Sequence, residues 1–353
     1  MKDIARMALV PGMEIAKDVT TSSGDIIVKA GTKVSDNTIL KLARYHIMLV
    51  TIMEDVDYAV TYFEKIRLSE GFKKFEKVYN EAMPVYKKIM NDLVESDVPV
   101  PLSELMQLYN NIVESIDKRY PDLIIDYLYN MLPTEDDLTY AHCLNSALIA
   151  GVFARWLSLS PEKTEILIQC GFFYDIGKLK LPYELIWKPD KLTPVEYEKV
   201  KTHTILGFQM LQNQPLNDHI LKATLSHHEK FDGSGYPSKL HDVQIDFYAR
   251  VIAIIDAYEA MTSARTYRQS KHPFQVIEIF EEDQRKYDLE ILNMILYRVA
   301  NHIIGLKVLL NNDVKAEIIL INQSKLSRPL LRDDNSQFID LMNNPDLKIM
   351  GIY

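Results

Sequence analysis

Two aspartates follow directly on apolar segments that are predicted to lie in a helical core. Asp256 comes after Val251–Ile255, and Asp175 comes after Gly171–Tyr174. An ionised carboxylate that is buried without a partner is strongly destabilising, so such a residue needs a metal ion or a firm ion pair. Taken singly, each aspartate also fits a helix end or an ordinary salt bridge.

Four histidines extend the set. His227 and His228 end a predicted helix, and the glycine-rich segment 229–237 that follows can bring its backbone close to a ligand. His142 and His203 lie on two other predicted helices. One such histidine is more often a hydrogen-bonded core residue than a ligand. Four histidines and two aspartates on separate helices are the mixed set that a binuclear iron, manganese or zinc hydrolase needs.

Helix signals surround these residues. Ser-Pro at 160–161 predicts the start of a helix that runs towards Lys178. The segment 193–196, Thr-Pro-Val-Glu, is a capping box that opens a helix predicted to carry His203. The apolar segment Phe247–Met261 predicts a buried helix.

Turn signals and patterning divide the 353 residues into four predicted segments. Glycine and proline punctuate the first, where short β-branched runs predict strands and Ser35 begins a short helix to Leu42. The second is helical, with charges between apolar residues, as in a solvated connector that packs on its neighbour. The last alternates like β-strands. We predict a mainly α protein with a small α+β N-terminal module (1–58), a helical connector (59–133), a helical metal-binding domain (134–305) and a short β-rich C-terminal appendage (306–353).

Composition limits the classes of function. The chain is 47% hydrophobic and 25% charged, which is ordinary for a protein with a packed core and excludes a disordered tail protein. Cys143 and Cys170 are too few for a disulfide framework and suggest a reducing compartment. A formal charge of −9 argues against duplex nucleic acid or an anionic membrane as partner. We find no signal peptide and no membrane-spanning run, and expect a cytoplasmic protein.

The order and spacing of the candidate residues resemble the HD-GYP domain, a branch of the HD phosphohydrolase superfamily, over about residues 135–304. The matching residues are Tyr174-Asp175-Ile176-Gly177-Lys178, His203, His227-His228-Glu229, Asp232 to Pro237, Asp256 and Arg265-Thr266-Tyr267-Arg268. Residues 1–58 and 306–353 also resemble, more weakly, appendages of some bacterial HD-GYP domains. The fold that the resemblance implies is an HD-type helical bundle.

The resemblance implies a metal-dependent phosphodiesterase that hydrolyses cyclic di-GMP to linear pGpG or GMP by a metal-bound hydroxide. Two divalent ions, iron or manganese, would be bound, with Asp175 as the bridging ligand. Carried over by position, the metal ligands would be His142, Asp175, His203, His227, His228 and Asp256.

The same resemblance assigns residues to the substrate. Lys178 would stabilise charge on the phosphoryl oxygens and, with Asp175, would be catalytic. Arg265 and Arg268 match phosphate-binding positions, although both also fit a solvated helix end. Gly235, Tyr236 and Pro237 would shape the pocket and support base stacking, with a plain turn as the alternative.

Three positions depart from the family pattern. Tyr174 stands where the family has the histidine of its His-Asp doublet, which leaves one metal with His142, Asp175 and Asp256. Leu138 stands where trinuclear members carry glutamate, which indicates two metals at most. Glu259 replaces an aspartate, a mild change.

These departures leave two classes of function open. The first is an active cyclic di-GMP phosphodiesterase. The second is a degenerate domain that binds cyclic di-GMP or a protein partner without hydrolysis, and Tyr174 motivates it. A hydrolase of another nucleotide is a further alternative. The terminal segments are expected to be regulatory or dimer-forming. The expected partner is a second copy of this chain, in a homodimer, or a signalling protein.

Overall fold

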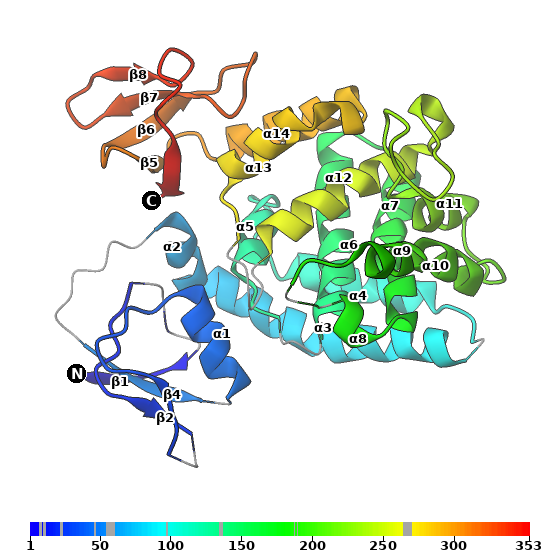
Figure 1. Ribbon diagram of the computed structural model, residues 1–353, viewed down its shortest axis with the longest axis horizontal. Coiled ribbons are helices and arrows are strands. Elements are labelled where there is room, and N and C mark those ends of the chain that lie inside the picture. The colour runs from blue at the N-terminus through cyan, green and yellow to red at the C-terminus, as the bar shows by residue number, and fades with distance from the viewer. Residues whose placement is uncertain are drawn as a thin grey trace.

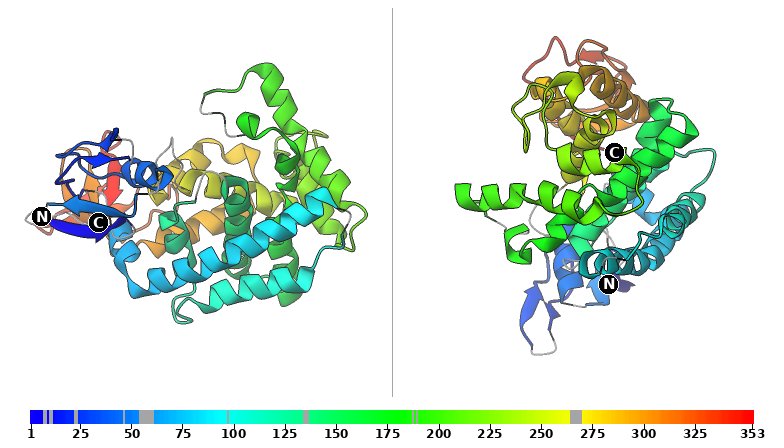
Figure 2. Two further views of the ribbon diagram at one scale, coloured as in Figure 1. Left: turned by 90° about the horizontal axis from the view of Figure 1, so that it is seen from below. Right: turned by 90° about the vertical axis from the view of Figure 1, so that its right-hand side faces the viewer.

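The computed structural model describes residues 1–6, 9, 12–21, 24–45, 47–53, 61–96, 98–133, 137–186, 188, 190–263 and 270–353. Helices form the body of the molecule, and small sheets lie near both termini (Figure 1). The two terminal modules lie on the same side of the helical body (Figures 1 and 2). The predicted mainly α class is therefore confirmed. Among the described helices, none combines the length and the apolar character that a membrane crossing requires.

The N-terminal module contains two antiparallel strand pairs and one helix. Ser35 caps the helix, because its hydroxyl accepts a hydrogen bond from the Thr38 amide at 3.2 Å. The module has its own apolar core, which includes Ile15, Leu42 and Val50. The helix predicted to Leu42 continues to Arg44. The elements are β1 (Lys2–Ala5) paired with β4 (Leu49–Ile52), β2 (Val19–Thr20) paired with β3 (Ile26–Val28), and α1 (Asp36–Arg44).

The predicted connector is a set of helices that pack tightly on the body. In α3 the buried residues recur every three or four positions, which makes one apolar stripe. Tyr86 of this stripe donates a hydrogen bond to the carbonyl of Phe172 at 2.7 Å, and Tyr79 donates one to Asn145 at 2.7 Å. The helices are α2 (Tyr62–Leu68), α3 (Glu70–Glu95), α4 (Leu102–Glu114) and α5 (Leu123–Asn130).

Two helix ends differ from the prediction. The helix that opens after Ser160 ends at Phe173 and is followed by a 3-10 turn, so it stops short of Lys178. The helix of the capping box ends at Lys201, and His203 begins a new helix instead of lying inside that one. Gly177 explains the close packing here, because a Cβ at this position would lie 1.9 Å from the carbonyl oxygen of His203.

The helical body continues through α12, which confirms the buried helix predicted over Phe247–Met261 and ends one residue later. Its elements are α6 (Leu138–Trp156), α7 (Pro161–Phe173), η3 (Ile176–Lys180), α8 (Tyr183–Ile186), α9 (Pro194–Lys201), α10 (His203–Leu211), α11 (Asp218–Ser226), η4 (Asp242–Gln244), α12 (Phe247–Thr262), α13 (Pro273–Glu282), η5 (Gln284–Lys286) and α14 (Leu289–His302).

The C-terminal segment is an antiparallel sheet in the order β8-β7-β6-β5-β9. Alternate residues such as Val308, Leu310, Ala316 and Ile318 are buried and join the same apolar cluster as the helices. The predicted β-rich appendage is therefore present and packs on the body. Its strands are β5 (Lys307–Leu310), β6 (Lys315–Leu320), β7 (Leu330–Asp333), β8 (Phe338–Asp340) and β9 (Ile349–Ile352).

His272 ties this sheet to α13 and makes stability depend on pH. Its Nε2–H donates to the carbonyl of Ile349 at 3.0 Å, and its Nδ1 accepts from the Gln275 amide at 3.4 Å. Burial lowers the pKa of His272 to about 4, below the value of 6.5 expected in an unfolded chain. The stabilisation is complete above pH 6.5 and is lost as the pH falls towards 4. We expect this group to reduce the free energy of unfolding by up to about 3 kcal/mol over that window.

Urea denaturation of the wild-type chain and of His272→Gln, between pH 4 and pH 7.5, measures this effect. The substitution should flatten the pH dependence of the unfolding free energy. His241→Gln, at an exposed histidine, is the matched control and should leave the slope unchanged. Identical slopes for His272→Gln and the wild-type chain would contradict the prediction.

Candidate metal centre

Asp175 lies at the centre of the candidate site and is fully buried. Its Oδ1 is 3.2 Å from Nε2 of His203 and 3.6 Å from Nε2 of His227. Its Oδ2 is 3.2 Å from Nε2 of His142 and accepts a hydrogen bond from Lys178. The structure thus brings together all six predicted ligands in two groups that share this aspartate. The groups are His142, Asp175 and Asp256, and Asp175, His203, His227 and His228.

The helix ends described above place these side chains. Asp175 follows the end of α7, His203 begins α10, and His227 follows the last residue of α11. His142 and Asp256 come from inside α6 and α12. A continuous helix through Lys178 or through His203 would have pointed these side chains elsewhere. The interruptions that the sequence did not predict are therefore part of how the site is built.

The two buried histidines beside Asp175 present lone pairs to it. Nδ1 of His203 donates to the carbonyl of Val200 at 2.6 Å, and Nδ1 of His227 donates to the carbonyl of Thr224 at 3.0 Å. Burial lowers the pKa of His203, so its ring is neutral and its Nε2 is an acceptor.

The Nε2 atoms of His203 and His227 and Oδ1 of Asp175 are therefore hydrogen-bond acceptors that face one another. The two Nε2 atoms lie 3.3 Å apart, and Oδ1 of Asp175 has no hydrogen-bond partner among the described residues. Such an arrangement is electrostatically unfavourable unless a cation lies between the groups, and imidazole nitrogens with carboxylates are ligands of divalent transition metals. The backbone carbonyls that hold each Nδ1 are the outer contacts typical of metal-binding histidines. The donor set fits a metal ion.

A buried network holds His142. Its Nδ1 donates to the carboxylate of Glu259, whose other oxygen accepts from Asn145 at 2.9 Å and from Ser263. Burial alone would lower the pKa of His142, but Glu259 and the neighbouring aspartates raise it well above its ordinary value. Asn145 also accepts from Tyr79 of α3 at 2.7 Å.

Glu259 was predicted only as a substitution of the family pattern, and its contact with His142 was not predicted. The spacing contained a signal, because Glu259 stands one turn after Asp256 and Asn145 one turn after His142. No local pattern indicates Tyr79, which comes from a helix more than sixty residues away.

The hydroxyl of Tyr174 lies where a metal ion would bind His142. It is 2.6 Å from Nε2 of His142 and 3.0 Å from Oγ of Ser146. Burial and the charge of Asp256 raise the pKa of Tyr174 well above its ordinary value, so the side chain is a neutral phenol. Because Nδ1 of His142 already donates to Glu259, Nε2 is the ring nitrogen left for a metal, and the hydroxyl of Tyr174 lies against it. Tyr174 therefore contacts the group formed by His142, Asp175 and Asp256, which we call the first ligand group.

Lys178 connects the centre to the surface. Burial lowers the pKa of this lysine, but the charges of Asp175 and Asp256 outweigh that effect and raise it above its ordinary value. The side chain is therefore an ammonium ion. The side chains of Lys178, Asp256 and His228 are each about a fifth exposed, whereas Asp175 is fully buried. These three residues mark the opening of the site.

The Gly-Tyr-Pro segment forms one wall of the opening. The ring of Tyr236 stacks on His228 with centroids 4.8 Å apart, and Nζ of Lys201 lies 5.3 Å from the Tyr236 centroid. The buried carboxylate of Glu229 accepts from the amides of Ser238 at 2.6 Å and Leu240 at 3.1 Å. Pro237 follows a cis peptide bond. The contact of Lys201 with Tyr236 was not predicted, and Glu229 was predicted only as part of the motif.

Gly235 is required by a close approach of backbone to backbone. A Cβ at this position would lie 2.4 Å from Cα of Glu229 and 2.5 Å from the carbonyl oxygen of His228. We expect Gly235→Ala to displace the segment and to reduce kcat/KM for a nucleotide substrate by more than about tenfold, because the ring on His228 moves with it. Steady-state kinetics checks this. Ser234→Ala, at an exposed neighbouring position, should stay within about twofold, and equal kinetics for the two variants would contradict the prediction.

Two predicted substrate residues, Arg265 and Arg268, lie outside the described residues, and their role stays a prediction. Leu138 is buried one turn before His142 and brings no ligand atom to that position.

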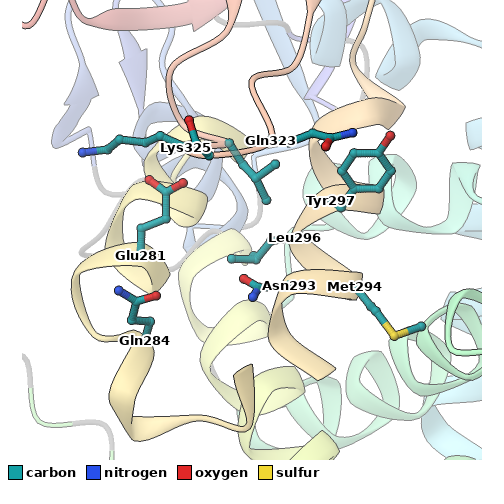
Figure 3. A pocket seen from close by; sticks show the side chains of 10 residues that line it. Glu281, Gln284, Asn293, Met294, Leu296, Tyr297, Gln323 and Lys325 are labelled. Carbon is teal, nitrogen blue, oxygen red and sulfur yellow. The ribbon is translucent and has the colours of Figure 1, made fainter. Parts of the chain in front are cut away.

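A second groove of about 670 Å³ lies between α13, α14 and the segment after β6 (Figure 3). Its lining includes Glu281, Tyr297 and Lys325, and its described lining residues include no histidine or aspartate. Figure 3 shows Glu281 and Tyr297 on the helices and Lys325 on the loop that faces them. This groove is separate from the candidate metal centre.

The site lies in a part of the chain that is similar to known proteins. Residues 126–291 match the HD domain family. A cyclic di-GMP phosphodiesterase of Thermotoga maritima is 32% identical over 186 residues, which cover 51% of this chain and 50% of that protein. A 3'3'-cGAMP-specific phosphodiesterase of Vibrio cholerae is 34% identical over 154 residues, which cover 44% of this chain and 36% of that protein.

The fold has a solved counterpart. The structure of a HDG"Y"P protein from Bdellovibrio bacteriovorus covers 84% of this chain and 99% of its own, with a TM-score of 0.52 and 14% identity. At that identity the likeness concerns the fold, and it confirms the predicted HD-type bundle. The chain spans about half the length or less of the curated relatives named above. Together these findings support a protein with an HD domain at residues 126–291 that is similar in sequence to cyclic di-GMP phosphodiesterases.

Proposed function

We propose that this chain is a metal-dependent phosphodiesterase that hydrolyses cyclic di-GMP to linear pGpG or GMP. The observation that carries the proposal is Asp175, one carboxylate shared by two groups of ligand atoms. Relatives named as cyclic di-GMP phosphodiesterases give the substrate class. Because these relatives are named for hydrolysis, they favour an enzyme over a domain that only binds.

Two divalent ions, iron or manganese, fit the mixed nitrogen and oxygen donors of the two groups. Asp175 would bridge them, with His203, His227 and His228 on one side and His142 and Asp256 on the other. Bound there, the ions would lower the pKa of water and offset negative charge on the phosphoryl oxygens.

The chain's own residues position the substrate. The Lys178 ammonium is held beside Asp175 and reaches the opening, where it is placed to offset charge on a phosphoryl oxygen. Tyr236, stacked on His228, presents a ring for a base. Arg265 and Arg268 are proposed to bind phosphate because they supply positive charge to a chain whose formal net charge is −9.

The direct test is turnover of cyclic di-GMP by the purified chain loaded with Fe(II) or Mn(II), with the products separated by chromatography. We expect linear pGpG or GMP, and loss of turnover after treatment with a chelator. A parallel reaction with 3'3'-cGAMP tests the substrate named for the Vibrio relative. Calorimetric binding of cyclic di-GMP without turnover under either metal would overturn hydrolysis and support the binding domain instead.

A further inference from the structure

A groove of about 380 Å³ opens beside the metal centre, between α3, the start of α6, η3 and α8. Its polar and aromatic lining consists of Lys87, Thr139, Tyr140, Lys178 and Tyr183, and leucine and isoleucine side chains form the rest. This volume is at the small end of the range for sites that enclose a small molecule. The groove therefore suits part of a dinucleotide.

Two residues join the groove to the metal centre. Lys178 lines the groove and also donates to Oδ2 of Asp175. Leu138 lines it one helical turn before His142, so both side chains lie on the same face of α6. The groove and the metal centre therefore share the Lys178 side chain as a common wall.

Lys87 is positioned rather than left to move in solvent. Its Nζ lies 2.7 Å from Oδ1 of Asp137 and 5.3 Å from the centroid of the Tyr140 ring. The side chain is about one third exposed, so a ligand in the groove can reach the ammonium. An ion pair and a cation–π contact together reduce the conformational freedom that ligand binding would otherwise remove.

Tyr183 supplies the aromatic element. It lies on the short helix α8, and close to half of the residue's surface is exposed. Exposed aromatic rings next to ammonium groups are the combination that binds unpaired bases together with phosphates. Lys87, which also lines the groove, comes from α3, which lies outside the residues that match the HD domain family.

Resting on the proposed function, we propose that this groove is the subsite for the half of the cyclic dinucleotide that is not being cleaved. The base of that half stacks on Tyr183, and its phosphate contacts Lys87. The predicted connector thus supplies a residue that binds substrate, and the second phosphodiester is held while the first lies at the metal centre.

The test separates binding from hydrolysis. The Kd for a hydrolysis-resistant phosphorothioate analogue of cyclic di-GMP is measured by calorimetry on the metal-loaded chain. Turnover of bis(p-nitrophenyl) phosphate, which has no base and one phosphodiester, is measured in parallel. The variants are Lys87→Ala and Tyr183→Ala. The matched controls are Lys88→Ala, at the exposed neighbour on α3, and Tyr120→Ala, at an exposed tyrosine away from the groove.

We expect each groove variant to raise the Kd about tenfold and each control to leave it within about twofold. Turnover of bis(p-nitrophenyl) phosphate should be equal in all five proteins. A Kd that is unchanged in both groove variants, or a wild-type chain that does not bind the analogue, overturns the subsite. A third outcome is a wild-type chain that binds the analogue with a dependence on Lys87 and Tyr183 yet cleaves neither cyclic di-GMP nor bis(p-nitrophenyl) phosphate. That result overturns the proposed hydrolysis and supports the subsite.

Discussion

Asp175→Asn is expected to lose metal from both ligand groups at once. The carboxylate is the residue that the two groups share, and its Oδ1 is the buried acceptor without a hydrogen-bond partner among the described residues. An asparagine keeps the size but removes the negative charge, and it leaves the Lys178 ammonium unpaired beside two histidines. Loss even of an outer contact to a metal ligand typically reduces affinity or rate by about 10- to 100-fold. Removal of the shared ligand should exceed that and abolish measurable turnover.

Elemental analysis and cyclic di-GMP turnover, on the same preparation, check this result. Asp190→Asn, at an exposed aspartate, is the matched control and should keep both metal and activity. Far-ultraviolet circular dichroism establishes that both variants are folded. Full metal content with full activity in folded Asp175→Asn would show that this carboxylate is not the shared ligand, and the proposed site would fail with it.

The candidate ligands could be predicted from the sequence because a charged residue in an apolar segment is a strong local signal. Asp256 inside a buried helix and Asp175 after Gly171–Tyr174 required partners, whatever the fold. Four histidines of suitable spacing supplied candidates for those partners. The structure brings these side chains together, and their role as ligands stays a proposal that the metal analysis tests.

The helix ends around the site could not be predicted in the same way. Helix signals favoured one helix that runs towards Lys178 and one helix that carries His203, and no break was predicted in either. The breaks arise from packing between distant segments, because the backbone at Gly177 lies against the carbonyl of His203. Such a contact can be predicted only when the positions of both segments in the fold are known.

The same limit applies to contacts across segments. Asn145 and Glu259 stand one turn from predicted ligands, and helical spacing alone points to them. Tyr79 and Lys87 lie in the predicted connector, where charge between apolar residues reads as a solvated face. Only the packing of α3 on the body shows that one contacts Asn145 and the other lines the groove.

Tyr174→His is expected to increase metal binding by the first ligand group. In the wild-type chain the hydroxyl of Tyr174 lies 2.6 Å from Nε2 of His142, the ring nitrogen that a metal would use. A histidine removes this competing hydroxyl and adds an imidazole nitrogen to His142, Asp175 and Asp256. By the scale typical for a gain or loss of metal contacts, we expect about 10- to 100-fold tighter binding of Mn(II) at this group and a higher kcat on cyclic di-GMP.

A metal titration followed by calorimetry distinguishes the two groups. The wild-type chain should show one tight event, from the group with three histidines, and one weak event, and Tyr174→His should strengthen the weak one alone. Tyr174→Phe separates the two causes, because it removes the hydroxyl without adding a ligand and should strengthen the weak event less than histidine does. If Tyr174→Phe matches Tyr174→His, the competing hydrogen bond is the whole effect. If neither changes the weak event, Tyr174 does not compete for His142, and the first group owes any weakness to another cause.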